Sequence, residues 1–361
     1  MRVAVSAGEP SGRVMSDLFR QAMGSIEPRC EVVSLEDTVS VKSVLGFWEG
    51  LMASGRLRPA LSRAEERVRA LKPDAVVLIA FSGFHLPLGR RLRRLGFPVL
   101  YLSPPQVWAW GGFRVRTLRK AADKVVCLFH FEEELLKRAR VDAVYLGYPL
   151  LDAVTRTKSR PEVLRQLGFG AEERYVAFLP GSRPAEVAYH RPLFRTVFTR
   201  LAATGQGLRG VMIAEPGGAE PDGMVATRQS RYDLMRHAEC ALVVSGTATA
   251  ECAILGTPMI ACYHLAPASR LLARLLVRSR FFALPNIVAG HEVVPEYLEP
   301  DAERLADGLR ALLADEPRRR RMVTDLRSVA RGLGPGGAMR RIAAIALEQM
   351  ASGGAGPAQL P

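Results

Sequence analysis

The stretch that decides the fold is SGTATAECAILGTPMIACY, which runs from Ser245 to Tyr263 and follows the apolar run CALVV at 240–244. An apolar strand, a turn of small hydroxylated residues, a short apolar helix and a second apolar strand make one strand–helix–strand unit. The turn leaves backbone N–H groups free at the positive end of the helix, which suits an anion such as a phosphate. Glu251, in the first helical turn, either complements the helix dipole or accepts hydrogen bonds from a ribose. An ordinary helix N-cap is the alternative interpretation.

The composition indicates a globular protein of two domains with an anionic partner. The chain has 361 residues, of which 48% are hydrophobic and 24% charged. No apolar run approaches the roughly 20 residues that span a bilayer, and the start MRVAVSAGEPSG lacks the apolar region of a signal peptide. Five cysteines without CxxC spacing indicate buried free thiols in a reducing cytoplasm. The formal charge of +14 favours nucleic acid, an anionic membrane or a phosphorylated substrate.

Short apolar strands alternate with amphipathic helices along the chain, which predicts an α/β protein with two doubly wound parallel sheets. In the first half we expect strands at 3–6, 30–34, 75–79, 99–102, 124–128 and 143–146 and helices at 11–23, 58–71, 88–95, 115–122 and 131–138. After a polar bridge, the second half has expected strands at 175–179, 210–214, 240–244 and 259–263 and a helix at 301–314. The predicted domains are 1–165 and 170–335, followed at 336–361 by a helix that is a candidate for packing back on the first domain, and a flexible tail. Because ligands bind beyond the carboxyl ends of such strands, we expect a cleft between the domains.

Two further turns follow predicted strands. In LPGSR at 179–183, Gly181 lets the backbone approach a ligand, and Ser182 and Arg183 can hold phosphate oxygens. The alternative is a helix cap at Ser182 with Arg183 in a structural salt bridge. The turn AGEPSG at 7–12 can open a nucleotide domain, but it lacks the full GxGxxG spacing, and packing of the strand against the helix is the alternative.

Five segments in order resemble the lipid-A-disaccharide synthase family. They are AGEPSG at 7–12, SPPQVWAW at 103–110, LPGSRPAEV at 179–187, SGTATAE at 245–251, and LPNIVAG at 284–290 with EVVPE at 292–296. The resemblance spans nearly the whole chain. It implies a GT-B fold, in which two Rossmann-like domains face a central cleft.

The resemblance also implies a reaction and its site. The family transfers 2,3-diacylglucosamine from UDP to a phosphorylated diacylglucosamine acceptor in lipid A biosynthesis, with inversion and release of UDP. No cofactor is expected beyond the UDP-sugar donor, and no metal, in keeping with the lack of an Asp-x-Asp cluster. By resemblance, Asn286 lies in the active-site segment, and the donor contacts are Gly181, Ser182, Arg183, Ser245, Gly246, Thr247, Ala248, Thr249 and Glu251. Helix-end N–H groups and Arg183 would stabilise the charge that develops on the leaving UDP.

The acceptor half departs from the family pattern. AFSGFH at 80–85 stands where the family has Asp-Ala-Pro-Asp-Phe-Asn, and Tyr148 replaces a usual His. Transfer to a sugar hydroxyl needs a general base, for which Glu9 and His85 are the remaining candidates. For His85 the alternative is a histidine that fills a polar niche near a strand end. Three outcomes stay open: a synthase with a substitute base, a transferase with a different acceptor, or a protein that binds UDP-sugar without turnover.

Two basic, apolar segments suggest a membrane surface as partner. SVLGFWEGLM at 43–52, followed by Arg56, Arg58 and Arg63, and RLLARLLVRSR at 270–280 have the pattern of interfacial segments. A core-facing helix is the alternative for the first. We therefore expect a peripheral protein on the inner face of the cytoplasmic membrane. No recognised nucleic-acid module accompanies the charge, so nucleic acid is not an expected partner. The oligomeric state stays open.

Overall fold

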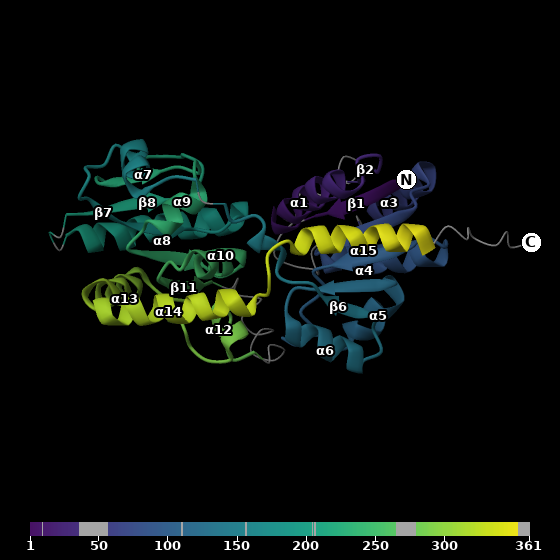
Figure 1. Ribbon diagram of the computed structural model, residues 1–361. Helices are drawn as coiled ribbons and strands as arrows, with labels where there is room; N and C mark the ends of the chain where they lie inside the picture. Colours follow the sequence, from purple (N-terminus) through teal and green to yellow (C-terminus); the bar gives the residue numbers. More distant parts are fainter. Residues whose placement is uncertain are drawn as a thin grey trace, which may run out of the picture. The chain divides into compact units, whose positions relative to one another are not determined.

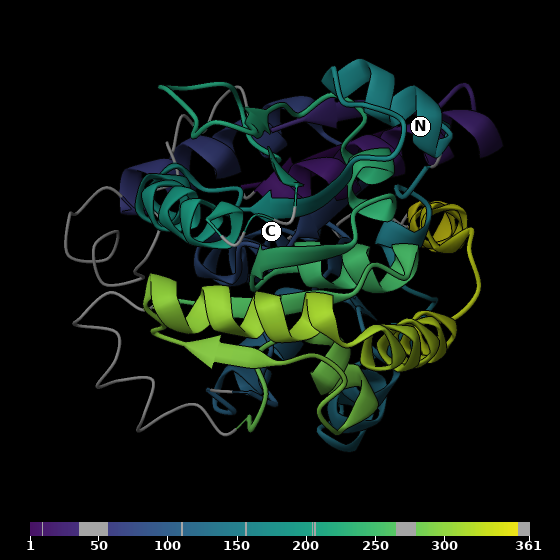
Figure 2. The ribbon, with the colours of Figure 1, turned by 90° about the vertical axis from the view of Figure 1, so that its left-hand side faces the viewer.

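The computed structural model describes residues 1–8, 10–35, 57–109, 111–155, 157–203, 205, 207–264 and 279–352. These residues form two compact units (Figure 1), and Figure 2 shows the elements of the second unit from another direction. One unit comprises Met1–Ala153 together with the segment from Leu333 onward, and the other lies between Val154 and Gly332. Each unit is a parallel sheet covered by helices, so each has its own core.

The first unit has strand order β2-β1-β3-β4-β5-β6, all pairs being parallel. Its strands are β1 (Arg2–Ala7), β2 (Glu31–Ser34), β3 (Ala75–Ile79), β4 (Val99–Leu102), β5 (Lys124–Cys127) and β6 (Ala143–Tyr145). Its helices are α1 (Pro10–Ile26), α3 (Leu57–Leu71), α4 (Ser82–Arg94), α5 (Arg114–Ala121), α6 (His130–Arg138) and the 3₁₀ turn η2 (Pro149–Leu151). Every residue of β3, AVVLI, is buried, as expected for a strand with helices on both faces.

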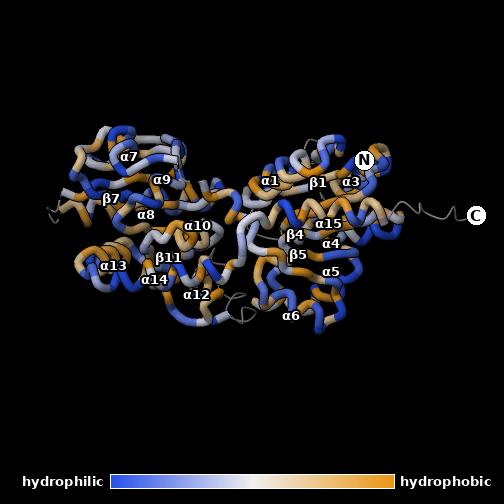
Figure 3. The backbone as a smooth tube through the Cα atoms, viewed as in Figure 1, coloured by the Kyte–Doolittle hydropathy of each residue, from blue (hydrophilic) through white to orange (hydrophobic). Residues whose placement is uncertain are grey.

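The second unit has strand order β12-β11-β10-β7-β8-β9, also parallel. Its strands are β7 (Arg174–Leu179), β8 (Leu208–Met212), β9 (Met224–Ala226), β10 (Cys240–Val244), β11 (Met259–Tyr263) and β12 (Glu296–Leu298). Its helices are α7 (Arg160–Leu167), α8 (Pro184–Ala202), α9 (Arg231–Arg236), α10 (Thr247–Leu255), α12 (Leu284–Ala289), α13 (Ala302–Ala314) and α14 (Glu316–Gly332). Helices such as α13 alternate hydrophilic and hydrophobic positions, as amphipathic helices do (Figure 3).

The last helix, α15 (Ala338–Ser352), belongs to the first unit, where it packs on α1. Asp152 fixes its start, because its carboxylate accepts hydrogen bonds from the backbone N–H groups of Gly337 at 2.6 Å and Met339 at 2.8 Å. The Arg341 guanidinium donates to the carbonyl of Leu146 at 2.8 Å. The end of the chain therefore completes the domain that its beginning starts.

The structure confirms the predicted α/β class with two Rossmann-like domains and differs in several details. The boundary between the units follows Ala153, so α7 lies in the second unit, whereas the sequence analysis drew the boundary at 165–170. Helix α7 occupies part of the expected polar bridge and begins with a capping box between Ser159 and Glu162. The three-residue edge strands β9 and β12 were not expected, because they are too short to show a period.

The proposed membrane segments fall mostly outside the described residues. The segment 43–52, Arg56 and residues 270–278 lie outside the described residues, while Arg58 and Arg63 lie on α3. Among the described helices, none combines the length and the apolar character required to cross a bilayer.

Candidate functional site

The second unit has its topological switch point between β7 and β10. β8 lies on one side of β7 and β10 on the other, so the connections that leave these two strands diverge. Ligands of open parallel sheets bind at the carboxyl edge where this happens. The turns that follow β7 and β10, which contain Gly181–Arg183 and Ser245–Gly246, both leave from this point.

The turn after β10 is open. Gly246 is exposed, serves as N-cap of α10 and has space around it, because a Cβ placed there would meet no atom of the described residues within 4 Å. As a glycine it has no side chain with which to cap the helix. Thr247 and Ala248, in the first turn, are half-buried. The backbone N–H groups at this positive helix end can therefore meet a ligand.

Hydrogen bonds hold the segment around residue 283 against this turn. The Ser245 hydroxyl donates to the carbonyl of Phe282 at 2.7 Å. The Thr249 hydroxyl donates to the Gly246 carbonyl at 2.8 Å and accepts from the Leu284 N–H at 3.2 Å. Ser245 and Thr249 thus shape the turn, and their hydroxyls are already used within the protein.

The turn after β7 is closed over by a carboxylate. Gly181 has φ +106°, and a Cβ there would lie 2.7 Å from Cβ of Glu186. Oε2 of Glu186 accepts from the backbone N–H groups of Ser182 at 3.2 Å and Arg183 at 3.3 Å. Oε1 of Glu186 accepts from Nη1 of Arg183 at 2.9 Å. This is the geometry of the alternative considered for this turn, a capped helix start with an Arg183 salt bridge, although the cap is Glu186 and not Ser182, which is exposed.

Glu251 is buried and paired with a residue that the sequence analysis missed. Its side chain is 7% exposed, and its carboxylate forms an ion pair with Arg231, at the start of α9. Nε of Arg231 is buried and has no hydrogen-bond partner among the described residues. The signal was available in principle, since a carboxylate within the apolar helix at 247–255 requires a cation, but nothing in the sequence identified which one.

Asn286 is fully buried and saturated. Its Nδ2 donates to the carbonyl of Val294 and to Oε1 of Glu296, both at 2.8 Å. Its Oδ1 accepts from the N–H groups of Val293 at 2.7 Å and Val294 at 2.9 Å. Every hydrogen-bonding position of this amide is therefore directed at the protein itself, and it holds the start of α12 to the segment before β12.

The Glu296 side chain, on β12, holds the segment 282–286 through hydrogen bonds. Its carboxylate accepts from the N–H groups of Phe282 at 3.0 Å and Ala283 at 2.8 Å, in addition to Asn286. Burial raises the pKa of Glu296, although these hydrogen bonds oppose the shift. Through Phe282, the network reaches Ser245 and the open turn.

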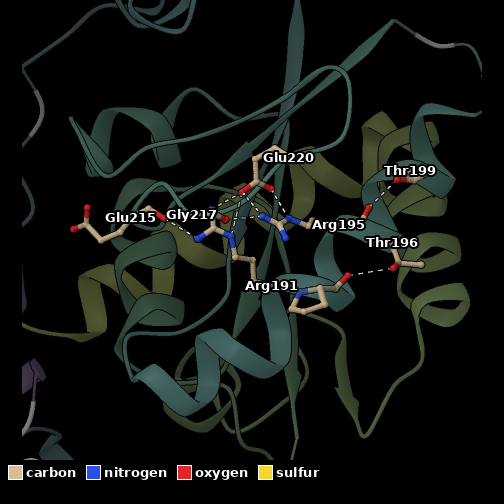
Figure 4. Close-up of polar contacts among 8 residues, drawn as sticks. Arg191, Arg195, Thr196, Thr199, Glu215, Gly217 and Glu220 are labelled. Atoms are coloured by element: carbon tan, nitrogen blue, oxygen red, sulfur yellow. Dashed lines mark hydrogen bonds and ion pairs between the residues drawn. The ribbon is translucent and has the colours of Figure 1, made fainter.

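A cluster of one glutamate and two arginines holds the loop that follows β8. The Glu220 carboxylate lies between the guanidinium groups of Arg191 and Arg195 from α8 (Figure 4). The same arginines donate to the carbonyls of Glu215 and Gly217, each at 2.7 Å. Burial would raise the pKa of Glu220, but the hydrogen bonds from Arg195 and Arg191 outweigh it and lower the pKa. The loop after β8 is thereby fixed to the helix that starts at the β7 turn.

In the first unit, the switch point lies between β1 and β3, and His85 is enclosed there. His85 is fully buried; its Nδ1 contacts the Ala80 carbonyl and its Nε2 the Ser6 hydroxyl, each at 2.9 Å. Because a carbonyl only accepts, Nδ1 carries the proton and Nε2 accepts from Ser6. Burial lowers the pKa of His85 to about 4, so the ring is neutral. Glu9, the other candidate base, lies outside the described residues.

Glu132 is a second group that the sequence analysis did not single out. Its Oε1 accepts from Nε1 of Trp108 at 2.9 Å, and its Oε2 accepts from the N–H groups of Leu128 at 2.9 Å and Phe129 at 3.1 Å. The carboxylate is 3% exposed, and burial raises its pKa to about 7. It joins the loop after β4 to the turn after β5. Tyr148 is buried and stacks on Phe129.

The described residues contain no group of three or more His, Cys, Asp or Glu side chains placed to hold a metal ion. All five cysteines are buried free thiols.

Comparison with known proteins gives a consistent result. The sequence profile of the family described as lipid-A-disaccharide synthetase matches residues 3–334. The lipid-A-disaccharide synthase of Syntrophus aciditrophicus (strain SB) is 35% identical over 370 aligned residues, covering 96% of this chain and 97% of that protein. The lipid-A-disaccharide synthase of Solibacter usitatus (strain Ellin6076) is 32% identical and covers 98% of each.

Solved structures with the same architecture are more distant in sequence. UDP-GlcNAc 2-epimerase from Neisseria meningitidis, bound to UDP-GlcNAc, superposes with a TM-score of 0.64 at 12% identity, covering 96% of this chain and all of that one. The spinosyn rhamnosyltransferase SpnG superposes with a TM-score of 0.62 at 14% identity, covering 96% of this chain and all of that one. Likeness at this level of identity establishes the fold, which is of the GT-B type shared by glycosyltransferases and such epimerases.

Proposed function

The chain belongs to the lipid-A-disaccharide synthase family, and we propose that it transfers 2,3-diacylglucosamine from UDP to a phosphorylated diacylglucosamine with inversion. In this reaction the acceptor hydroxyl attacks the anomeric carbon while the bond from that carbon to the diphosphate oxygen breaks. UDP leaves with the bonding electrons, and the hydroxyl proton passes to a general base. The reaction class and the lipid A pathway follow from the family; the substrates and stereochemistry are the proposal.

The observation that carries the proposal is the open turn at Gly246. It combines an unobstructed glycine with the positive end of α10, at the switch point of the sheet. We place the diphosphate there, where the first N–H groups of α10 would stabilise the charge that develops on the leaving group. Arg183 lies on the neighbouring turn and supplies a cation with a planar fork suited to phosphate oxygens.

The remaining donor residues have supporting roles in this proposal. Gly181 and Ser182 allow the diphosphate to approach the β7 turn, where its oxygens would compete with Glu186 for the same N–H groups. Glu251 would accept hydrogen bonds from the ribose, held in place by its ion pair with Arg231. Asn286 shapes the segment beside the turn through its four bonds to the protein. No cofactor enters the proposal.

A second candidate function is binding of a UDP-sugar with another acceptor or without turnover. It is supported by the acceptor side, where by the resemblance AFSGFH at 80–85 replaces an Asp-containing stretch of the family, and where His85 is enclosed. Because His85 is enclosed, Glu9 is the remaining candidate for the general base, and it would act through its carboxylate.

The test is release of UDP from UDP-2,3-diacylglucosamine in the presence of a diacylglucosamine 1-phosphate in detergent micelles. We expect release only when both substrates are present. Calorimetric binding of UDP without release with any acyl-sugar pair would instead support the second candidate.

Arg183→Ala tests the phosphate site separately, with Arg200→Ala, an exposed arginine at the far end of the same helix, as the matched control. We expect Arg183→Ala to weaken UDP binding about tenfold, equivalent to ~1.4 kcal/mol, and Arg200→Ala to have no effect. Equal affinities of the two variants would refute the proposed role of Arg183.

The lipidic substrates and the charge of +14 support a further part of the proposal, action at the inner face of the cytoplasmic membrane. Co-sedimentation with vesicles that contain an anionic lipid, and not with purely zwitterionic vesicles, is the expected result. Equal partitioning into both would argue against an electrostatic contact.

A further inference from the structure

The turn after β3 is strained at two consecutive residues. Ala80 has φ +52° and Phe81 φ +43°, which is the left-handed region for two side-chain-bearing residues in a row. Such conformations are disfavoured for L-residues and persist only where the surroundings enforce them, commonly at ligand sites. The turn lies at the carboxyl edge of β3, beside the switch point of the first unit.

Buried hydrogen bonds hold this turn in place. The Ala80 carbonyl accepts from the Tyr101 hydroxyl at 2.8 Å and from Nδ1 of His85 at 2.9 Å, and His85 is itself fixed by Ser6. The Ala80 N–H donates to the carbonyl of Leu102 on β4 at 2.8 Å. Tyr101 and His85 are both fully buried. Two buried side chains therefore donate hydrogen bonds to the Ala80 carbonyl. These bonds hold Ala80 in a conformation that it would not otherwise adopt.

The consequence is the position of the Phe81 ring, which lies directly on Gly8. A Cβ at Gly8 would be 2.2 Å from Cδ1 and 2.6 Å from Cγ of Phe81. The ring also stacks on Phe84, with centroids 5.8 Å apart, and meets His85 edge-on at 5.6 Å. Phe81 nevertheless stays partly exposed, unlike Phe84. An aromatic ring is thus held at the carboxyl edge of the sheet, beside the switch point between β1 and β3, on a residue that is partly exposed.

We propose that Phe81 is the residue that recognises the acceptor, its ring forming an apolar surface for the acylated sugar, and that Ser6, His85 and Tyr101 are positioning residues that hold the ring over Gly8. This rests on the proposed function, which supplies an acylated acceptor. Aromatic rings at the mouths of binding sites contribute apolar area at low cost in conformational entropy. A polar acceptor would find nothing to bond on this ring, so the ring selects for an acyl group or for the apolar face of the sugar.

His85 has a different role here from that of a base. Both of its nitrogens are committed to Ser6 and Ala80, and no part of the ring is exposed. The proton of the acceptor hydroxyl therefore goes to another group, and substitution of His85 acts only through the placement of Phe81.

The first experiment compares Phe81→Gly and Phe81→Leu with the wild type in the complete chain. Glycine accepts the left-handed conformation, so Phe81→Gly keeps the turn and removes only the ring; circular dichroism checks the fold. We expect the KM for the acceptor to rise about tenfold in Phe81→Gly and less in Phe81→Leu, while the KM for the UDP-sugar stays within about twofold. Phe113→Ala, which removes an aromatic ring that is 77% exposed, is the control and should change neither. Unchanged acceptor KM, or an equal rise for donor and acceptor, would overturn the proposal.

The second experiment tests the positioning residues. His85→Asn and Tyr101→Phe should raise the acceptor KM in the same direction, with the shape of the pH profile of kcat/KM unchanged. Loss of one limb of that profile in His85→Asn would show that His85 takes a proton and would overturn its assignment as a positioning residue.

The two proposals fail in distinguishable ways. If the wild type shows no turnover with any acyl-sugar pair, the proposed function fails, and binding of diacylglucosamine 1-phosphate micelles is then measured by calorimetry. Weaker binding to Phe81→Gly than to the wild type would still support Phe81, and equal binding would overturn it.

Discussion

Two glycines lie beside the switch points of the two units, and their surroundings are opposite. Gly246 follows β10 in the second unit, and a methyl group placed on it would meet nothing in the described part of the chain within 4 Å. Gly8 follows β1 in the first unit, and the same methyl group would overlap the ring of Phe81. Both glycines lie at the carboxyl edge of a parallel sheet, beside its switch point.

The difference concerns which ligand each edge can take. At Gly246 the helix start carries a glycine with open space around it, which suits a charged ligand. At Gly8 the protein's own aromatic ring covers the backbone, which leaves an apolar surface. Duplicated architecture therefore does not imply duplicated chemistry, because one side chain at one turn decides what the glycine beneath it can contact.

A shared feature makes the comparison sharper. In each unit a carboxylate accepts hydrogen bonds from two backbone N–H groups and one side-chain N–H group. The donors to Glu132 are Leu128, Phe129 and the Trp108 indole. The donors to Glu296 are Phe282, Ala283 and the Asn286 amide. Burial raises the pKa of both carboxyl groups, that of Glu132 to about 7. In both units a carboxylate with a raised pKa thus holds neighbouring loops in the same way. The two units differ in the surface that each offers to a ligand.

The largest expected effect on stability comes from removing the Glu132 carboxylate in the first unit. Glu132→Ala leaves the Trp108 indole and two backbone N–H groups without an acceptor in a buried place. We expect a loss of about 4 kcal/mol in the free energy of unfolding, at ~1–3 kcal/mol for each orphaned donor with partial relief by water. Guanidinium denaturation measures it. Glu296→Ala, at the more exposed site, should cost less, and the reverse order would contradict the comparison.

Glu132→Gln should make the stability less dependent on pH. The pKa of Glu132 is raised from 4.5 to about 7 in the folded chain, so between these values the unfolded chain loses a proton that the folded chain retains. The wild type therefore loses stability as the pH rises through this window, by about 3 kcal/mol in total. The glutamine variant lacks this contribution. Thermal unfolding from about pH 5 to about pH 8 should show the variant gaining on the wild type, and parallel curves would show that Glu132 titrates normally.

Gly8→Ala places a methyl group against the Phe81 ring. Because the overlap involves Cγ as well as Cδ1, the ring must move as a whole. We expect a loss of about 2 kcal/mol in stability from overpacking. The double variant Gly8→Ala/Phe81→Gly should recover most of it, since the obstacle is gone. Absence of recovery would locate the cost in the Gly8 backbone and not in the ring.

Gly246→Ala should have the smallest effect on stability and a specific effect on binding. The methyl group meets no obstacle, but at φ +159° and ψ −156° it strains a backbone conformation that is favourable only for glycine, so we expect a loss of about 1 kcal/mol in the free energy of unfolding. It should lower the affinity for UDP about tenfold by occupying the ligand's place, as calorimetry can measure. A variant that binds UDP as well as the wild type would show that the open turn is not the diphosphate site.

The fold could be predicted from the sequence largely because its strands are buried on both faces. Runs such as AVVLI at 75–79 and CALVV at 240–244 need no partner to be recognised, and both match observed strands. Helix α4 shows the limit: it begins at Ser82, whereas the expected helix began at Leu88, because Pro87 lies inside it. The edge strands β9 and β12, with three residues each, depend on their neighbours and carry no pattern of their own.

The candidate site was harder to predict, for a different reason. Turn composition drew attention to Gly181 and Gly246, and the departure from the family pattern to His85, but neither tells whether a side chain from elsewhere covers a turn. Glu186 covers the first, nothing described covers the second, and Ser6 reaches His85 from a strand far away in the sequence. Arg231 and Glu132 were missed because their roles depend on partners 20 and 24 residues away, in different elements.

The docking of α15 has a consequence for how the chain is made. The first unit begins at Met1, yet its α1 is covered by a helix that starts at Ala338, fixed through Asp152 and Arg341. Since translation proceeds from the N-terminus, the second unit has all of its segments before the first unit does. The domain whose synthesis starts first is therefore completed after the second unit, because the apolar face of α1 stays uncovered until α15 has been made.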